Sequence, residues 1–297
     1  MMVVVITMKK LLTGILAFML LLLWGCTPNE PQAQLAATTL PVYEFTSLLC
    51  QGTDLRVTKL VTESVSCLHE YTLKPAQMRA IEGADAVILS GAGLEDFMAD
   101  AMASTARIID ASHGLSLLET EHHHEAHGHH VHADDPHIWL SPVNAKAMAE
   151  NICAGLTGLY PAHEPLFREN LSALLQKLDA LQTYGETQLQ ALSCRELITF
   201  HDGFSYLAES FDLTVIMAVE EESGSEASAA ALIEIIRLME DHKIPVIFTE
   251  TNGSTAAASI ISAESGAKCY TLDMTMSGEN YFDAMYRNID TLREALQ

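Results

Sequence analysis

The chain has 297 residues, of which 49% are hydrophobic, so it can form one large domain or two lobes with cores of their own. Its formal charge is −23, from 16 basic and 39 acidic residues. This balance excludes a nucleic-acid-binding protein, because phosphates are bound by Lys and Arg. The unusual component is histidine, since seven of the 13 histidines lie between His122 and His132.

The N-terminal segment, residues 1–25, is predicted to be a signal peptide. Its apolar run from Leu11 to Leu23 follows two lysines and is too short for a comfortable membrane-spanning helix. The run ends in Leu23-Trp24-Gly25-Cys26, which resembles a bacterial lipobox, so Cys26 is the expected lipidation site and residues 26–34 a lipidated polar tether. An uncleaved membrane anchor is the alternative, and either interpretation places the remaining chain outside the cytoplasm.

Residues 35–160 are predicted to form an N-terminal lobe, because short apolar runs alternate with helical patterns. The predicted strands are 35–40, 55–61, 84–89 and 107–109, and the helices between them are 42–50 and 75–82. This alternation is typical of a parallel sheet with covering helices.

A histidine-rich, low-complexity segment, residues 119–135, interrupts this lobe and is predicted to be a loop. Free imidazoles are good zinc ligands at physiological pH. We expect the loop either to collect zinc weakly and pass it to a main site, to sense zinc abundance, or to be a dispensable solvated segment. Its histidines are His122, His123, His124, His127, His129, His130 and His132.

Two helices are predicted next. Ser141 is expected to be the N-cap of the first, with Pro142 at its first position and an end near Leu159. The second carries apolar residues at spacings of three and four, and the pattern weakens toward Leu192. We predict one long helix over residues 161–192 that links two lobes as a rigid spine.

Residues 193–297 are predicted to form a C-terminal lobe with the same alternation. The predicted strands are 197–200, 213–218, 245–249 and 269–272, and the helices are 227–242, 254–265 and one that begins near Tyr281. The predicted fold class is therefore α/β, with two lobes that each hold a mostly parallel four-stranded sheet with covering helices, joined by one long backbone helix.

Three histidines and one aspartate are candidate metal ligands. His69, His201 and Asp273 are expected in loops just beyond the carboxyl ends of strands, where ligand crevices of open α/β sheets lie. His137 is expected in the loop before the helix that starts at Pro142. Two ligands would then come from each lobe, so that one ion bridges the cleft. Taken singly, each residue has an ordinary interpretation as a cap, a turn residue or a hydrogen-bonding group.

Three neutral imidazoles and one carboxylate suit Zn²⁺, which prefers four nitrogen, sulfur or oxygen ligands at about 2.0–2.3 Å. Manganese would be expected to use more carboxylate oxygen. A saturated shell leaves no position for a reactive water, so we expect binding without catalysis. Thiolate ligation is not expected, because the cysteines after Cys26 include no C-x-x-C pair; they are Cys50, Cys67, Cys153, Cys194 and Cys269.

Read together, the four positions lie in motifs that resemble the zinc and manganese solute-binding proteins of ABC transporters, of the high-affinity zinc-uptake type. The resemblance covers nearly all of residues 35–297. Its most specific part is Asp135-Pro136-His137-Ile138-Trp139-Leu140-Ser141-Pro142. The other three parts are Leu68-His69-Glu70-Tyr71, with Leu68 where proline is usual, Phe200-His201-Asp202-Gly203, and Leu272-Asp273, with Met274 where zinc members often have proline.

The resemblance implies an extracytoplasmic, lipid-anchored monomer that captures Zn(II) as its transported ligand and delivers it to an ABC permease and its ATPase. Within this family His201 favours zinc, because the manganese branch commonly has glutamate there. An enzyme is not expected, since no H-E-x-x-H helix and no G-x-S-x-G elbow is present. Two alternative functions stay open: a manganese- or iron-binding member of the same family, and a surface metal-buffering or adhesion lipoprotein. The fourth metal ligand also stays open, because water, Glu70 or Glu250 could take the place of Asp273.

Overall fold

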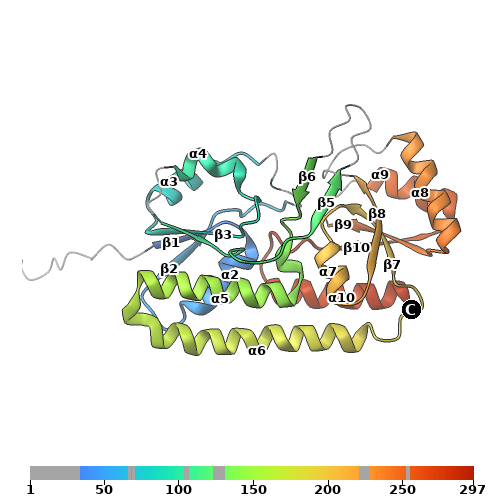
Figure 1. Cartoon of the computed structure of the whole chain (residues 1–297). Helices are drawn as coiled ribbons and strands as arrows, with labels where there is room; N and C mark the ends of the chain where they lie inside the picture. Colours follow the sequence, from blue (N-terminus) through green and yellow to red (C-terminus); the bar gives the residue numbers. More distant parts are fainter. Residues whose placement is uncertain are drawn as a thin grey trace, which may run out of the picture. The chain divides into compact units, whose positions relative to one another are not determined.

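Two parallel four-stranded sheets form the framework of the computed structural model (Figure 1). It describes residues 34–65, 68, 71–103, 107–122, 131–220, 228–251 and 255–297. The predicted signal peptide, Cys26 and the predicted tether lie outside the described residues, except that Gln34 begins the first strand. Of the helices within these ranges, none combines the length and apolarity needed to cross a membrane.

The N-terminal lobe is built on a sheet with the strand order β2-β1-β3-β4, in which all neighbours are parallel. Its inner strands are buried and apolar, as expected for a sheet covered on both faces. The strands are β1 (Gln34–Ala37), β2 (Arg56–Lys59), β3 (Ala86–Leu89) and β4 (Ile108–Asp110), and the helices are α2 (Leu40–Leu49), α3 (Pro75–Glu82) and the short α4 (Ala99–Met102).

The C-terminal lobe repeats this plan with the strand order β10-β9-β7-β8, again parallel throughout. The central strand β9 is buried along its whole length. The strands are β7 (Glu196–His201), β8 (Thr214–Glu220), β9 (Val246–Glu250) and β10 (Lys268–Leu272), and the helices are α7 (Ser205–Ser210), α8 (Ala229–His242), α9 (Thr255–Ser265) and α10 (Tyr281–Leu296).

Two long helices, α5 (Pro142–Leu159) and α6 (Glu164–Gln188), lie side by side and form the spine (Figure 1). Helix α6 contacts α2 of the N-terminal lobe and α10 of the C-terminal lobe, so it joins the two. The predicted N-cap of α5 is confirmed, because Ser141 Oγ accepts a hydrogen bond from Asn144 N.

The predicted fold class is confirmed, with differences at element ends. The first strand stops at Ala37, because α2 begins at Leu40 and Pro41 suits a first helical turn. The spine helix α6 is shorter than the predicted 161–192: a 3-10 turn, η3 (Pro161–His163), precedes it, and it ends at Gln188 before the chain enters β7.

We expected the histidine-rich segment to be a loop, but the structure shows that this is wrong for its two ends. Its two ends form an antiparallel ribbon of β5 (Glu119–His122) and β6 (Val131–Asp134). The two strands are paired through their backbones, and their sequences lack the alternation of apolar residues that would predict a strand. His122 and His132 therefore lie in strands. The five histidines between them, at positions 123, 124, 127, 129 and 130, fall outside the described residues.

A segment that follows β10 crosses to the N-terminal lobe and fastens the lobes together. Met276 O accepts a hydrogen bond of 2.9 Å from Leu40 N, at the start of α2. Ser277 Oγ lies 3.1 Å from Val65 N and accepts its hydrogen bond. This crossing segment, residues 274–278, lies directly after the predicted ligand Asp273.

Candidate metal centre

His201 lies where the C-terminal sheet reverses its strand order. It is the last residue of β7, not a loop residue as predicted, because its backbone still pairs with Glu220 of β8. From β7 the chain proceeds outward through β8 on one side and through β9 and β10 on the other, which makes the β7–β9 boundary a switch point of the kind that binds ligands. Only 2% of the His201 side chain surface is exposed.

His137 directly precedes the 3-10 turn η2 (Ile138–Leu140), and it is also 2% exposed. Its neighbour Trp139 is fully buried and donates from Nε1 to Met274 O at 2.8 Å. Tyr281 OH donates to Trp139 O at 2.7 Å. These bonds hold His137 against residues that follow β10, although His137 precedes the spine in sequence.

The two imidazoles face one another. His137 Nε2 and His201 Nε2 are 3.4 Å apart, and the ring planes are perpendicular at 90°. This separation is longer than the usual N–H hydrogen bond of about 2.7–3.2 Å. It equals the nitrogen–nitrogen edge of a tetrahedral zinc site, about 3.3–3.4 Å for Zn–N bonds of the usual length. The pair therefore fits two ligands of one zinc ion.

Gly203 allows this close approach. A Cβ at this position would lie 2.9 Å from His201 Cδ2, 3.0 Å from His137 Cε1 and 2.7 Å from Met274 Cε. These separations are shorter than ordinary van der Waals contact, so a side chain here would force Met274 and one or both rings to move. Met274 also lines a neighbouring pocket, so the imidazole pair and that pocket adjoin.

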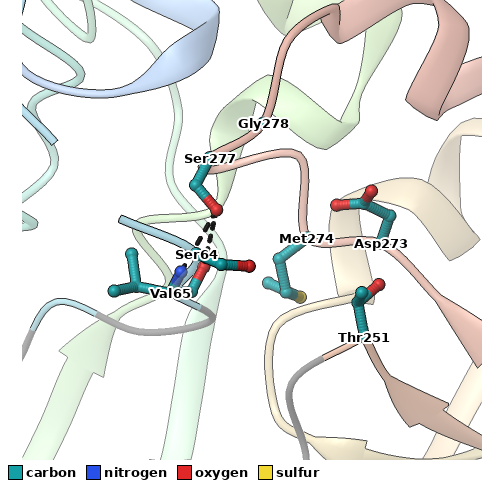
Figure 2. A pocket seen from close by; sticks show the side chains of 7 residues that line it. All are labelled: Ser64, Val65, Thr251, Asp273, Met274, Ser277 and Gly278. Carbon is teal, nitrogen blue, oxygen red and sulfur yellow. Dashed lines mark hydrogen bonds between the residues drawn. The ribbon is translucent and has the colours of Figure 1, made fainter. Parts of the chain in front are cut away.

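That pocket has a volume of about 200 Å³ and lies between the lobes (Figure 2). Asp273, directly after β10, lines it with a half-buried side chain, 32% exposed. Asp273 Oδ1 accepts a hydrogen bond from Thr275 N at 2.8 Å, and Arg287 Nη2 lies 3.9 Å from Oδ2. The pocket lining consists of Ser64, Val65, Thr251, Asp273, Met274, Ser277 and Gly278.

The structure brings two of the four predicted ligands together. Within the described ranges, no group of three His, Cys, Asp or Glu side chains lies close enough to hold one ion, so Asp273 does not join the imidazole pair there. His69 and Glu70 lie outside the described residues. Glu250, an alternative to Asp273, is the last residue of β9 and is buried.

The ends of the segment that carries His69 are joined by an ionic cluster. Glu63 forms a short ion pair with Lys74 and accepts a hydrogen bond from Tyr71 OH at 2.5 Å. These two donors, Lys74 foremost, lower the pKa of Glu63 to about 2. Residues on both sides of His69 are thus held together although they are eight or more positions apart along the chain.

Asp135 and Tyr206 were not predicted to have a role, although they lie in the sequence motifs around His137 and His201 or next to them. Asp135 Oδ1 accepts hydrogen bonds from His137 N at 2.9 Å and from His137 Nδ1 at 2.8 Å. Tyr206 OH accepts from Leu118 N at 2.8 Å and donates to Asp135 O at 3.2 Å. Burial raises the pKa of Tyr206 to about 12. The signal that identifies Asp135 is its position two residues before the candidate ligand His137.

The described cysteines take no part in this centre. Cys50 and Cys153 are buried free thiols, and Cys194 and Cys269 are free thiols nearer the surface. Burial raises the pKa of Cys50 to about 12, so it stays protonated at neutral pH. A protonated thiol is a poor metal ligand.

Two parallel α/β lobes on a helical spine, with two imidazoles paired at the switch point of the C-terminal sheet, have the architecture of metal-binding solute-binding proteins. Residues 35–295 match the profile of the family described as zinc-uptake complex component A, periplasmic, and the chain belongs to this family. The family and fold expected from the sequence motifs are thereby confirmed.

Known proteins similar to this chain bind metals. AdcA, a zinc-binding lipoprotein of Streptococcus pneumoniae serotype 4, is 31% identical over 310 aligned positions, which cover 97% of this chain and 61% of AdcA. A crystal structure of ZnuA has a TM-score of 0.78 at 29% identity, covering 89% of this chain and 99% of that one. The SBP FpvC of Pseudomonas aeruginosa, in complex with Mn²⁺, has a TM-score of 0.79 at 27% identity, covering 90% and 99%.

Proposed function

We propose that this protein captures Zn(II) between its lobes, outside the cytoplasm, and delivers it to an ABC permease and its ATPase as a transport component and not as an enzyme. The observation that carries the proposal is the buried His137–His201 pair, whose Nε2 atoms are 3.4 Å apart. Membership of a zinc-uptake family and similarity to a zinc-binding lipoprotein support the same metal.

The proposed ligands are His69, His137, His201 and Asp273. The carboxylate of Asp273 lines the pocket that adjoins the imidazole pair through Met274, and a movement of the lobes or of the crossing segment would bring it to the ion. The lipid anchor on Cys26 and a monomeric state belong to the same proposal. The seven histidines from His122 to His132 would form auxiliary, weaker zinc sites.

Metal titration of the purified protein tests this function. We expect one tight zinc site at neutral pH, with zinc preferred over manganese, because imidazole nitrogen suits zinc better. His201→Ala should weaken zinc binding by about two orders of magnitude or more, since a lost ligand is felt directly in the binding free energy. His242→Ala is the matched control, because His242 lies on the surface and pairs with Glu196, away from the site. Preference for manganese, or equal loss in both variants, would contradict the proposal.

A further inference from the structure

A buried carboxylate lies behind His137, on the side away from His201. Asp135 is fully buried, and its Oδ1 is 2.8 Å from His137 Nδ1 while His137 Nε2 faces His201. Because an ionised carboxylate only accepts hydrogen bonds, we assign the proton of this contact to His137 Nδ1. A neutral imidazole has a single N–H, and its Nε2 is then a bare lone pair, which is the form that binds a metal ion.

The position of this carboxylate is closely constrained. Asp135 N donates to Leu118 O at 2.8 Å, and Asp135 O accepts from Tyr206 OH at 3.2 Å. Pro136 restricts the backbone between Asp135 and His137, because its ring fixes φ. The backbone of Asp135 is thus held from both neighbouring segments, and its carboxylate cannot turn away from the imidazole without also breaking the hydrogen bond from His137 N.

The second oxygen of the same carboxylate adds an electrostatic argument. Among the described residues, Asp135 Oδ2 is buried and has no hydrogen-bond partner. A buried, half-satisfied carboxylate is costly by itself. A divalent cation on Nε2 of the ring that Asp135 holds offsets this cost, so the carboxylate favours cation binding as well as the correct tautomer.

We infer that Asp135 is a positioning residue for metal capture: it holds His137 in the Nδ1-protonated tautomer, so that Nε2 is ready to bind the cation that His201 shares. This inference rests on the proposed function and adds to it the residue that prepares one ligand. The alternative is a purely structural role, because Asp135 Oδ1 also accepts from His137 N in a tight turn.

The test compares the purified wild-type protein with Asp135→Asn, which keeps the shape and removes the charge. Zinc affinity and the tautomer of the His137 ring, read from nitrogen-15 NMR of the metal-free protein near neutral pH, are both measured. We expect a loss of zinc affinity of about 10–100-fold and a shift toward the Nε2-protonated tautomer. Asp134→Asn is the control, since it removes the same charge from the exposed neighbouring residue and should change neither.

If the asparagine variant fails to fold, the same measurements are made on Asp135→Ser, because serine can still accept the hydrogen bond from His137 N. Unchanged zinc affinity, or weaker affinity with an unchanged tautomer, would overturn the inference while leaving the proposed function intact. Wild-type protein that binds no zinc would instead overturn the proposed function. Equal effects of the Asp134 and Asp135 substitutions would show that Asp135 acts only through the net charge of the protein, which would also overturn the inference.

Discussion

At the scale of single residues, the N-terminal lobe contains a second buried carboxylate at the switch point of its sheet. Glu95 accepts hydrogen bonds from Thr38 Oγ1 at 2.5 Å, Ser90 N at 2.8 Å and Gly91 N at 3.0 Å. It thereby joins the ends of β1 and β3. Burial outweighs these bonds and raises the pKa of Glu95 to about 7.

This raised pKa predicts a pH-dependent stability. The unfolded carboxyl ionises near 4.5 and the folded one near 7, so between these values the folded state binds the extra proton and loses stability as the pH rises. Between pH 5 and pH 8, we expect the free energy of unfolding of the wild-type protein to fall by roughly 2–3 kcal/mol relative to that of Glu95→Gln.

Urea unfolding of both metal-free proteins at each pH checks this difference. All other titratable groups are the same in both proteins, so their contribution to the unfolding free energy cancels in the comparison. A difference in unfolding free energy that is the same at both pH values would show that Glu95 titrates as it does in the unfolded chain.

At the scale of elements, the turn between β7 and α7 determines how closely the imidazoles approach. Gly203→Ala should destabilise the metal-free protein by about 1–3 kcal/mol and weaken zinc binding, because the new Cβ would lie within 3.0 Å of both rings. Gly158→Ala in α5 is the control, since a Cβ there meets nothing within 4 Å, and helix propensity makes it neutral or stabilising. Urea unfolding and zinc titration of both variants measure the effect, and equal behaviour would contradict this role of the turn.

The β5–β6 ribbon is the element that carries the histidine-rich tract. The two chain segments that lead into the ribbon are joined outside it, because Asp135 N donates a hydrogen bond to Leu118 O at 2.8 Å. Deletion of residues 120–133 should therefore leave the tight zinc site in place and remove the weaker ones. Zinc titration distinguishes the two classes. Loss of the tight site on deletion would show that the ribbon belongs to it, and unchanged loading in zinc-poor medium would contradict a collecting role.

At the scale of the whole molecule, Trp139 connects the His137 segment, the crossing segment and α10. Trp139→Phe leaves Met274 O without its 2.8 Å donor and replaces a fully buried side chain by a smaller one. We therefore expect the free energy of unfolding to fall by about 2–3 kcal/mol. Tyr281→Phe removes only the hydroxyl that donates to Trp139 O and should cost about 1 kcal/mol. Urea unfolding compares the two, and a smaller loss for Trp139→Phe than for Tyr281→Phe would contradict this ordering.

Local sequence signals were sufficient to predict most helices and strands and the class of the protein. Strand and helix signals are local: an apolar run shows the strand β9, a serine–proline pair shows the start of α5, and a repeat of three and four shows α6. The motifs around His137 and His201 indicated the metal-binding family, and their histidines do meet. The ribbon β5–β6 escaped prediction because backbone pairing, which leaves no periodic pattern in side chains, stabilises it.

Which predicted ligands lie close together could be seen only in the folded structure. His137 and His201 are 64 positions apart, and their 3.4 Å separation depends on Gly203 and on bonds from Trp139 and Tyr206 that no local pattern records. The same holds for the carboxylate behind His137. Asp273 faces an adjoining pocket, and its ligand role and that of His69 remain predictions. The physical reason is that coordination geometry is set by packing between distant segments, whereas sequence periodicity reports only on neighbours along one element.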